Sequence, residues 1–173
     1  ASDVYKRQRF IIKSTDNLTM NIKEDFRLAL RELVYPVCIV SAHNDETKEN
    51  HAITVSSVTS LSFDPPSILV CINKDSSIHS SLKKDSNFNI SFLSSSQSEI
   101  SNLCGTDELS NKRFDNDFWN FKNKVGFIKN SQSVISCIVE EITSYGSHSV
   151  FIGNVIDVFK NGDTKPLLYG KGK

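Results

Sequence analysis

Short apolar runs separated by polar turns fill most of this chain, and they predict a core built from strands. The first periodic segment is an exception, because its pattern is that of a helix. Asn21 and Glu24 supply the N-cap and N3 residues of a capping box, and Pro36 cannot continue a helix. Between them, apolar residues recur at the spacing of one helix face: Ile22, Phe26, Leu30 and Leu33. We therefore predict an opening helix that Pro36 ends.

The segments that follow are rich in Val, Ile, Thr and aromatic residues and are bounded by turn residues, as strands are. Asp64-Pro65-Pro66 breaks one such region, because proline cannot extend a central ladder. Asn161-Gly162 is a strong hairpin signal. The predicted strands span residues 37–42, 52–61, 67–72, 88–93, 134–142, 149–159 and 166–169.

Two more short helices and one long loop complete the pattern. A capping serine precedes a helix predicted over residues 77–84. Ser96 and Glu99 form a second capping box, for a helix that ends at Gly105. Residues 106–130 are irregular, polar and aromatic, and so long a loop usually carries a function or packs against a partner.

Strands joined by short turns, without regular alternation of strand and helix, predict a mainly β fold: an antiparallel barrel with short peripheral helices. At 173 residues the chain suits one domain with a sizeable core. We predict that this domain covers residues 19–173. Residues 1–18 lack periodicity and are predicted to be a disordered tail or a remnant of cloning.

Charge narrows the classes of function. Lys and Arg together number 20, as do Asp and Glu, so the net charge is zero. Such a chain lacks the basic surface that nucleic acid or an anionic membrane would attract, and neither is an expected partner. No apolar run approaches the roughly 18 residues of a membrane span, and the N-terminus lacks a secretory pattern. A cytoplasmic location is expected.

The four cysteines recur 33 residues apart, but nothing else repeats at that period. They form no CxxC pair, the histidines lack metal-ligand spacing, and no metal is expected. Cys38, Cys71 and Cys137 each precede an isoleucine inside an apolar run, which predicts buried free thiols that pack as small hydrophobes. The sequence also lacks GxGxxG, GxxxxGK[ST], GxSxG and HExxH motifs, so it predicts neither a Rossmann nor a P-loop site.

Three segments could bind an anionic, partly flat cofactor. Thr54, Val55, Ser56 and Ser57 place hydroxyls on an otherwise apolar strand, where hydroxyls and backbone N–H groups match the polar edge of a flavin ring. An ordinary Ser/Thr-rich edge strand is the alternative, and it remains open.

The second segment is a polar turn before a helix. A helix N-terminus attracts anions, Lys74 adds a charge, and Ser76 and Ser77 add hydroxyl donors after Asn73. A plain serine N-cap would look the same.

The third segment is the turn Gly146-Ser147-His148 between two long strands. A histidine at a barrel rim could contact a nucleotide or act as a neutral donor, or it could simply face water. Arg113 beside Phe114, in the long loop, could reach a phosphate or be a solvated loop charge. His43 and His51 are predicted to be surface residues.

In this order and with these gaps, the segments resemble the flavin reductase-like family, the FMN-binding split barrels. The match covers residues 26–172. The motifs that carry it are Tyr35-Pro36-Val37, residues 51–57 (HAITVSS), Asp64-Pro65-Pro66, Val70-Cys71-Ile72-Asn73, Ser76, Arg113-Phe114, Gly146-Ser147-His148, residues 151–155 (FIGNV) and residues 166–169 (PLLY).

The resemblance implies a six-stranded antiparallel Greek-key split barrel, a homodimer, and flavin near the subunit interface. It implies an NAD(P)H:flavin oxidoreductase that supplies reduced flavin to a monooxygenase partner, with FMN or FAD as the cofactor and NADH or NADPH as the donor. His148 would be the catalytic residue. The implied cofactor-binding residues are Thr54, Val55, Ser56, Ser57, Asn73, Lys74, Ser76, Ser77, Arg113 and His148.

Two positions depart from the family pattern. Ser147 stands where the family often has Asp, and Ile78 stands where it often has Thr. An FMN-binding protein without turnover, such as an electron carrier or sensor, therefore remains an alternative. A third reading is an interaction barrel whose aromatic loop, residues 114–121, contacts a partner.

Overall fold

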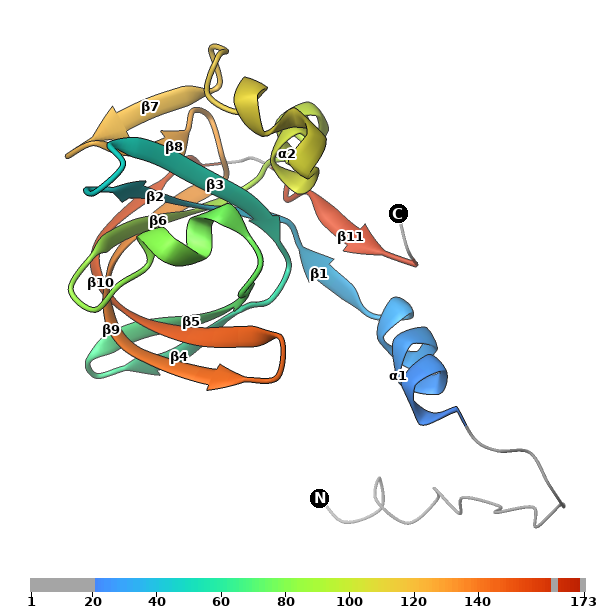
Figure 1. Ribbon diagram of the computed structural model, residues 1–173. Helices are drawn as coiled ribbons and strands as arrows, with labels where there is room; N and C mark the ends of the chain where they lie inside the picture. The colour runs from blue at the N-terminus through green and yellow to red at the C-terminus, as the bar shows by residue number, and fades with distance from the viewer. Residues whose placement is uncertain (1–20, 163–164, 172–173) are drawn as a thin grey trace, which may run out of the picture.

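The computed structural model describes residues 21–162 and 165–171, so the prediction for residues 1–18 lies outside the described residues. Most of the described chain forms one antiparallel sheet that curls around a core (Figure 1). In sheet order its strands are β3 (Glu49–Val55), β2 (Cys38–Asn44), β6 (Asn87–Phe92), β9 (Ser133–Tyr145), β10 (His148–Lys160), β5 (Pro66–Asn73) and β4 (Val58–Phe63).

The main sheet has seven strands where the resemblance implied six, because the segment predicted as one strand over residues 52–61 is two. The chain turns at Ser56 and Ser57. There Ser57 Oγ donates to the carbonyl of Cys71 at 2.9 Å, and the Cys71 N–H donates to the carbonyl of Ser57 at 3.2 Å. These bonds fasten the turn to β5, so that β4 runs back along β5.

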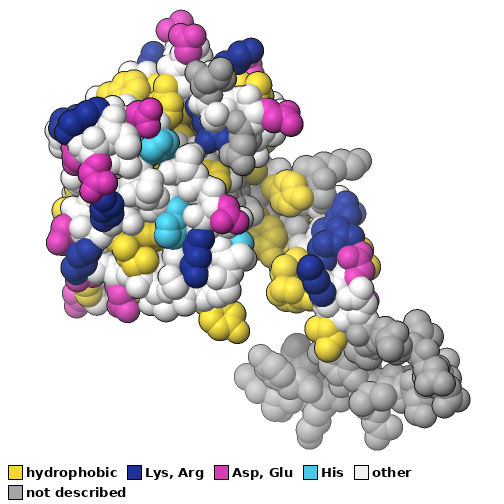
Figure 2. All heavy atoms as spheres, in the orientation of Figure 1, with side chains coloured by type: hydrophobic (Ala, Val, Ile, Leu, Met, Phe, Trp, Pro, Cys, Tyr) yellow, Lys and Arg dark blue, Asp and Glu magenta, His cyan; other side chains and the backbone are white. Residues whose placement is uncertain are grey.

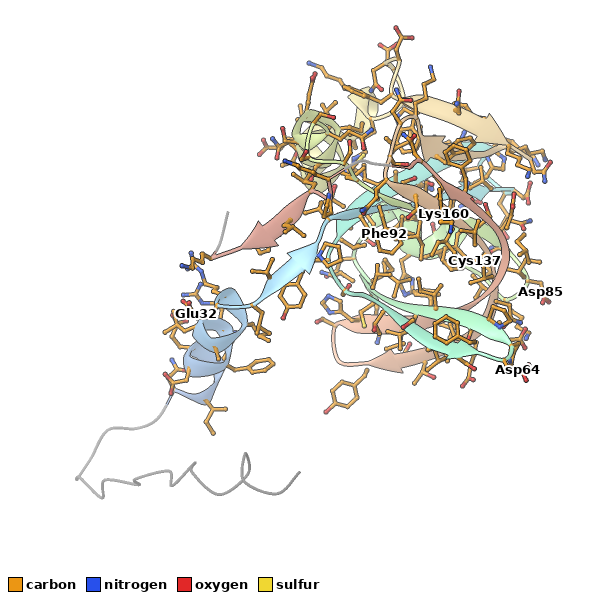
Figure 3. All side chains as sticks on the ribbon, turned by 180° about the vertical axis from the view of Figure 1, so that it is seen from behind. Glu32, Asp64, Asp85, Phe92, Cys137 and Lys160 are labelled. Atoms are coloured by element: carbon orange, nitrogen blue, oxygen red, sulfur yellow. The ribbon has the colours of Figure 1, made fainter. Side chains whose placement is uncertain are left out.

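Strand alternation explains why the curled sheet has two apolar layers. Val40 of β2 packs inside the curl with residues such as Val139 and Phe151, while its neighbour Ile39 packs outside, under α2 (Ser98–Gly105). Both β2 side chains are fully buried. Figure 3 labels Cys137 among the strands of the barrel, where it belongs to the inner layer.

An arm projects from this barrel (Figures 1 and 3). It consists of α1 (Ile22–Arg31) and of β1 (Val34–Pro36) paired with β11 (Leu168–Gly170). The predicted cap is present, since Asn21 Oδ1 accepts from the N–H of Glu24 at 3.3 Å. The helix ends at Arg31 rather than at Pro36, because the residues of β1 pair with β11 as a strand.

The hairpin predicted at Asn161-Gly162 does not return a strand to β10. The backbone of residues 165–167 instead bonds to the segments after β6 and before β2: the Ser95 N–H donates to Lys165 O, and the Val37 N–H donates to Leu167 O. These bonds carry the chain to β1, so the local turn signal is overridden by long-range pairing.

The remaining helices also differ in detail from the predictions. The helix after Asn73 is the short 3₁₀ helix η1 (Ser77–Ser81), and Ser76 makes no side-chain cap to it. Gln97 precedes α2, and its Oε1 accepts from the N–H of Ser94 at 2.9 Å instead of capping the helix, so the second capping box does not form.

The loop predicted over residues 106–130 is more ordered than its composition suggested. It contains the 3₁₀ helix η2 (Asp107–Lys112) and a hairpin of β7 (Trp119–Lys122) and β8 (Val125–Ile128). The Trp119 ring packs in the layer beneath α2. This segment therefore covers one end of the barrel rather than standing apart from it (Figure 1).

No helix in the described part of the chain is long and apolar enough to cross a membrane. The cytoplasmic location expected from the sequence stays a prediction.

Candidate functional site

The candidate site lies along β3 and across the ends of β5 and β10. β3 is at one end of the main sheet, so one row of its backbone groups faces away from any neighbouring strand. Figure 2 shows histidine side chains reaching the surface on this face of the barrel. The strand edge predicted to meet a flavin is therefore present.

The hydroxyls of this strand are largely engaged within the protein. Thr54 Oγ1 donates to the carbonyl of Ser101 at 2.7 Å and so anchors α2 against β3. Val55 packs against the inner core. Ser56 is half-buried at the turn, and the Ser57 hydroxyl donates to the carbonyl of Cys71. Thr54 and Ser57 thus shape the wall, and their contact with a cofactor stays a prediction.

The turn after β5 is held by its own side chains. Asn73 Oδ1 accepts from the N–H of Asp75 at 3.1 Å, and Ser76 Oγ donates to the carbonyl of Asn73 at 2.8 Å. Lys74 Nζ lies 2.9 Å from the carbonyl of Gly146, to which it donates, and its N–H donates to Ser147 O. The predicted phosphate turn is therefore docked onto the predicted histidine turn.

His148 begins β10 directly opposite Asn73 on β5. It is exposed, and its Nδ1 lies 2.9 Å from Ser147 Oγ. Gly146 has a φ of +54°, a left-handed conformation that glycine adopts without steric cost, and this lets β9 and β10 connect tightly. The structure thus brings together two motifs that lie about 70 residues apart in the sequence.

A groove of about 440 Å³ reaches the turn after β5 at Ser77. It brings two of the predicted cofactor-binding residues, Ser77 and Arg113, into one lining with six further residues. The residues that line it are Glu49, Asn50, His51, Ala52, Ser77, Ser110, Arg113 and Phe114.

Arg113 has a structural role that the sequence did not reveal. Its side chain is buried at 4% exposure. The guanidinium donates to the carbonyls of Leu103, Ala52 and Thr106 at 3.3, 2.9 and 2.8 Å. It therefore joins the end of α2 and the start of η2 to the edge of β3, which builds the wall of the groove. A direct phosphate contact of Arg113 stays a prediction.

His51 was expected to be a surface residue, but it lines the groove and is half-buried. Its Nδ1 lies 2.7 Å from Ser81 Oγ on η1, and its Nε2 lies 3.8 Å from Glu49 Oε2. Burial lowers the pKa of His51, and this outweighs the opposite effect of Glu49, so the neutral ring is favoured. The only sequence signal for this location was that His51 directly precedes the strand predicted over residues 52–61.

Three of the four cysteines are buried thiols and not candidate nucleophiles for this site. All four are free, but Cys71, which was predicted to be buried, is only partly buried. Burial raises the pKa of Cys38, Cys104 and Cys137 to about 12, so these thiols stay protonated and unreactive at neutral pH. Among residues 21–162 and 165–171, no group of three or more His, Cys, Asp or Glu side chains is placed to hold a metal ion.

The arrangement suits a flavin phosphate better than a hydrolytic reaction. A strand edge offers backbone groups to a flat ring, a cationic turn lies beside it, and an exposed imidazole stands across the ladder. The class of protein follows from comparison with known families, while the roles of these site residues stay predictions. A model of the flavin reductase like domain matches residues 30–173, and the chain belongs to this family.

Individual relatives support the same family assignment. The reductase component of the FADH(2)-dependent resorcinol hydroxylase of Rhizobium sp. (strain MTP-10005) is 31% identical, over 86% of this chain and 83% of its own. The NADH:riboflavin 5'-phosphate oxidoreductase of Streptomyces pristinaespiralis is 27% identical, over 84% and 82%. The prediction of a flavin reductase that uses a nicotinamide donor is confirmed at the level of these relatives.

Among solved structures, the NADH:FAD oxidoreductase SgcE6 of Streptomyces globisporus C-1027, in complex with NAD and FAD fragments, has a TM-score of 0.80. The two chains share 21% identity, and the match covers 92% of this chain and 94% of that one. At this identity the likeness concerns the fold, and it confirms the predicted mainly β class.

Proposed function

We propose that this protein is an NADH-dependent flavin reductase that binds FMN along β3 and delivers reduced flavin to a monooxygenase. The observation that carries the proposal is the docking of the turn at residues 73–77 onto the turn at residues 146–148, beside the β3 groove. The reductase component of a resorcinol hydroxylase, 31% identical, supports a monooxygenase as the acceptor.

The residues divide the work of binding and alignment. The outer edge of β3 would pair with the polar edge of the flavin, and the turn of Lys74 and Ser77 would hold its phosphate. A bound flavin supplies the chemistry, as the acceptor of the hydride that a reduced nicotinamide gives up. His148, exposed opposite Asn73, would orient the nicotinamide.

The two departures from the family pattern weigh little against turnover in this geometry. Ile78 is fully buried in the inner core, so the side chain at this position does not face the groove. The hydroxyl of Ser147 hydrogen-bonds Nδ1 of His148 and can orient the ring as a carboxylate would.

The reaction is tested by mixing the purified chain with FMN and NADH and following absorbance at the nicotinamide band. We expect oxidation well above the protein-free rate. If NADH and NADPH are both inert, the proposal is wrong. FMN that stays bound through gel filtration, with negligible NADH oxidation, would instead identify an electron carrier or sensor.

We further propose a homodimer, because α1 buries no side chain against the rest of residues 21–162 and 165–171. None of its ten residues is buried, and the side chains of Ile22 and Phe26 are 73% and 63% exposed. Isolated helices of this length are marginal in water, so a second copy is expected to cover the apolar face. Figure 2 shows hydrophobic side chains gathered on this arm.

Light scattering on the eluting protein tests the dimer. The wild type should have twice the mass of one chain, and Phe26→Ser should shift it toward the monomer. Lys23→Ser, on the same helix, is the matched control and should leave the mass unchanged. A monomeric wild type would overturn this proposal without affecting the reductase assignment.

A further inference from the structure

A chain of hydrogen bonds links His79 to the strand that carries His148. His79 Nε2 lies 2.9 Å from Ser149 Oγ, and Ser149 Oγ lies 3.1 Å from Ser144 Oγ. Ser149 is fully buried and directly follows His148, and Ser144 is its ladder partner on β9. The chain thus ties η1 to both strands of the β9–β10 hairpin.

The helix that carries His79 also borders the candidate groove. Ser77 lines the groove, and Ser81 hydrogen-bonds the groove residue His51. The His79 ring stands edge-on to Phe151, with ring centroids 5.4 Å apart and planes at 74°. Packing and hydrogen bonding therefore fix His79 against β10, while Ser77 of the same helix lines the candidate groove.

We infer that His79 is a positioning residue for the nicotinamide, acting through Ser149 on the location of His148. This inference rests on the proposed role of His148. Lys74 holds the turn at residues 146–148 from outside, through the carbonyls of Gly146 and Ser147. His79 holds the start of β10 from inside, so the turn is clamped on two sides.

The clamp predicts a specific kinetic effect. Hydride transfer requires close alignment of two rings, and a displacement of about 1 Å can lower a rate by on the order of 100-fold. The phosphate turn is held by Asn73 and Ser76 independently of Ser149. Loss of the His79–Ser149 hydrogen bond should therefore impair the use of NADH more than the binding of FMN.

Two substitutions separate hydrogen bonding from packing. His79→Leu keeps an apolar side chain against Phe151 but removes the polar atom at Nε2, whereas His79→Gln can place an amide group there. We expect His79→Leu to lower kcat/KM for NADH about 10- to 100-fold with less than a threefold change in the Kd of FMN, and His79→Gln to restore most of the loss. Equal losses in both variants, or a matching loss of FMN affinity, would overturn the inference.

A double variant tests whether His79 acts through His148. In a His148→Ala background, His79→Leu should lower kcat/KM for NADH little further, since the group it positions is gone. Independent, additive losses would show that His79 acts elsewhere.

A measurement on flavin-free protein keeps the inference testable if the reductase assignment fails. In ¹⁵N NMR spectra, the imidazole signals of His148 should shift in both His79→Leu and Ser149→Ala. They should stay in place in Ser80→Ala, which removes an exposed hydroxyl of η1 that donates to the carbonyl of Ser77. Unmoved His148 signals in the first two variants would refute the positioning role.

Discussion

His148 and Asn73 face each other across the β5–β10 ladder, at the last residue of one strand and the first of the other. The phosphate turn and the histidine turn therefore extend from the same rung. Lys74 reinforces the rung by donating from both its backbone and its ammonium group to the opposite turn. The two turns share this rung, although their proposed ligands differ.

The first prediction separates those ligands. His148→Ala removes an exposed side chain that closes no core contact, so the fold should persist. We expect kcat/KM for NADH to fall about tenfold or more, while the Kd of FMN changes little. Steady-state kinetics and flavin fluorescence titration provide the two readouts. A larger effect on FMN than on NADH would make His148 a flavin ligand instead.

The second prediction concerns Lys74. Lys74→Met keeps most of the stem but removes the charge, and losing a charge-assisted contact costs about 1.5–3 kcal/mol, so the Kd of FMN should rise roughly 10- to 150-fold. Riboflavin, which lacks the phosphate, should bind the variant and the wild type similarly. Lys160→Met, at the far end of β10, is the control and should bind FMN normally. If riboflavin and FMN weaken equally, Lys74 does not act on the phosphate.

Local sequence patterns predicted most of the strands. They failed where contacts between residues far apart in the sequence determine whether a segment forms a strand or a turn. Ser56 and Ser57 are compatible with a strand as well as with a turn. The hydrogen bonds between Ser57 and Cys71, 14 residues away, stabilise the turn. Asn161-Gly162 is a hairpin signal by itself, yet the chain beyond it pairs with β1.

In the candidate site, too, local patterns identified residues but did not predict their long-range contacts. The order of the motifs predicted Asn73 and His148 as site residues. Only the register of β5 on β10 shows that the two residues lie opposite each other. Arg113 could be read as a phosphate ligand or a solvated charge, and the structure shows a buried guanidinium bound to three carbonyls. No pattern near Arg113 in the sequence encodes those carbonyls, because two of them belong to other elements.

The third prediction follows from the lowered pKa of His51. Burial favours its neutral form in the folded state, so the unfolded chain binds the proton more readily. The contribution of His51 to stability is therefore fully present above its ordinary pKa of about 6.5 and is lost as the pH falls below that value. We expect the Tm difference between wild type and His51→Gln to be larger at pH 7.5 than at pH 5.5. A difference that is constant or grows on acidification would contradict this.

The fourth prediction uses the unequal burial of the thiols. Cys71 is partly exposed, whereas Cys38, Cys104 and Cys137 are buried and burial raises the pKa of each to about 12. Iodoacetamide at pH 8 should label the native protein at Cys71 first, as peptide mass spectrometry can show. Denatured protein should be labelled at all four positions. Early labelling of Cys38 or Cys137 would mean that the barrel interior is open to solvent.

The last prediction concerns the close packing of the inner core at Gly153. A Cβ at this position would lie 2.5 Å from Cζ of Phe88 and 2.9 Å from Cβ of Cys137, too close for either contact to persist. Gly153→Ala should therefore cost about 1–3 kcal/mol, as overpacking of a core does.

For a domain of this size, that cost corresponds to a fall in Tm of roughly 2–4 °C per kcal/mol. Gly162→Ala is the matched control. A Cβ there meets nothing within 4 Å, so its Tm should stay equal or rise slightly as the unfolded chain loses freedom. Differential scanning fluorimetry of the two variants distinguishes the cases. Equal Tm values would mean that Phe88 can move aside, and then the inner core would not be the rigid support on which the groove and its turns depend.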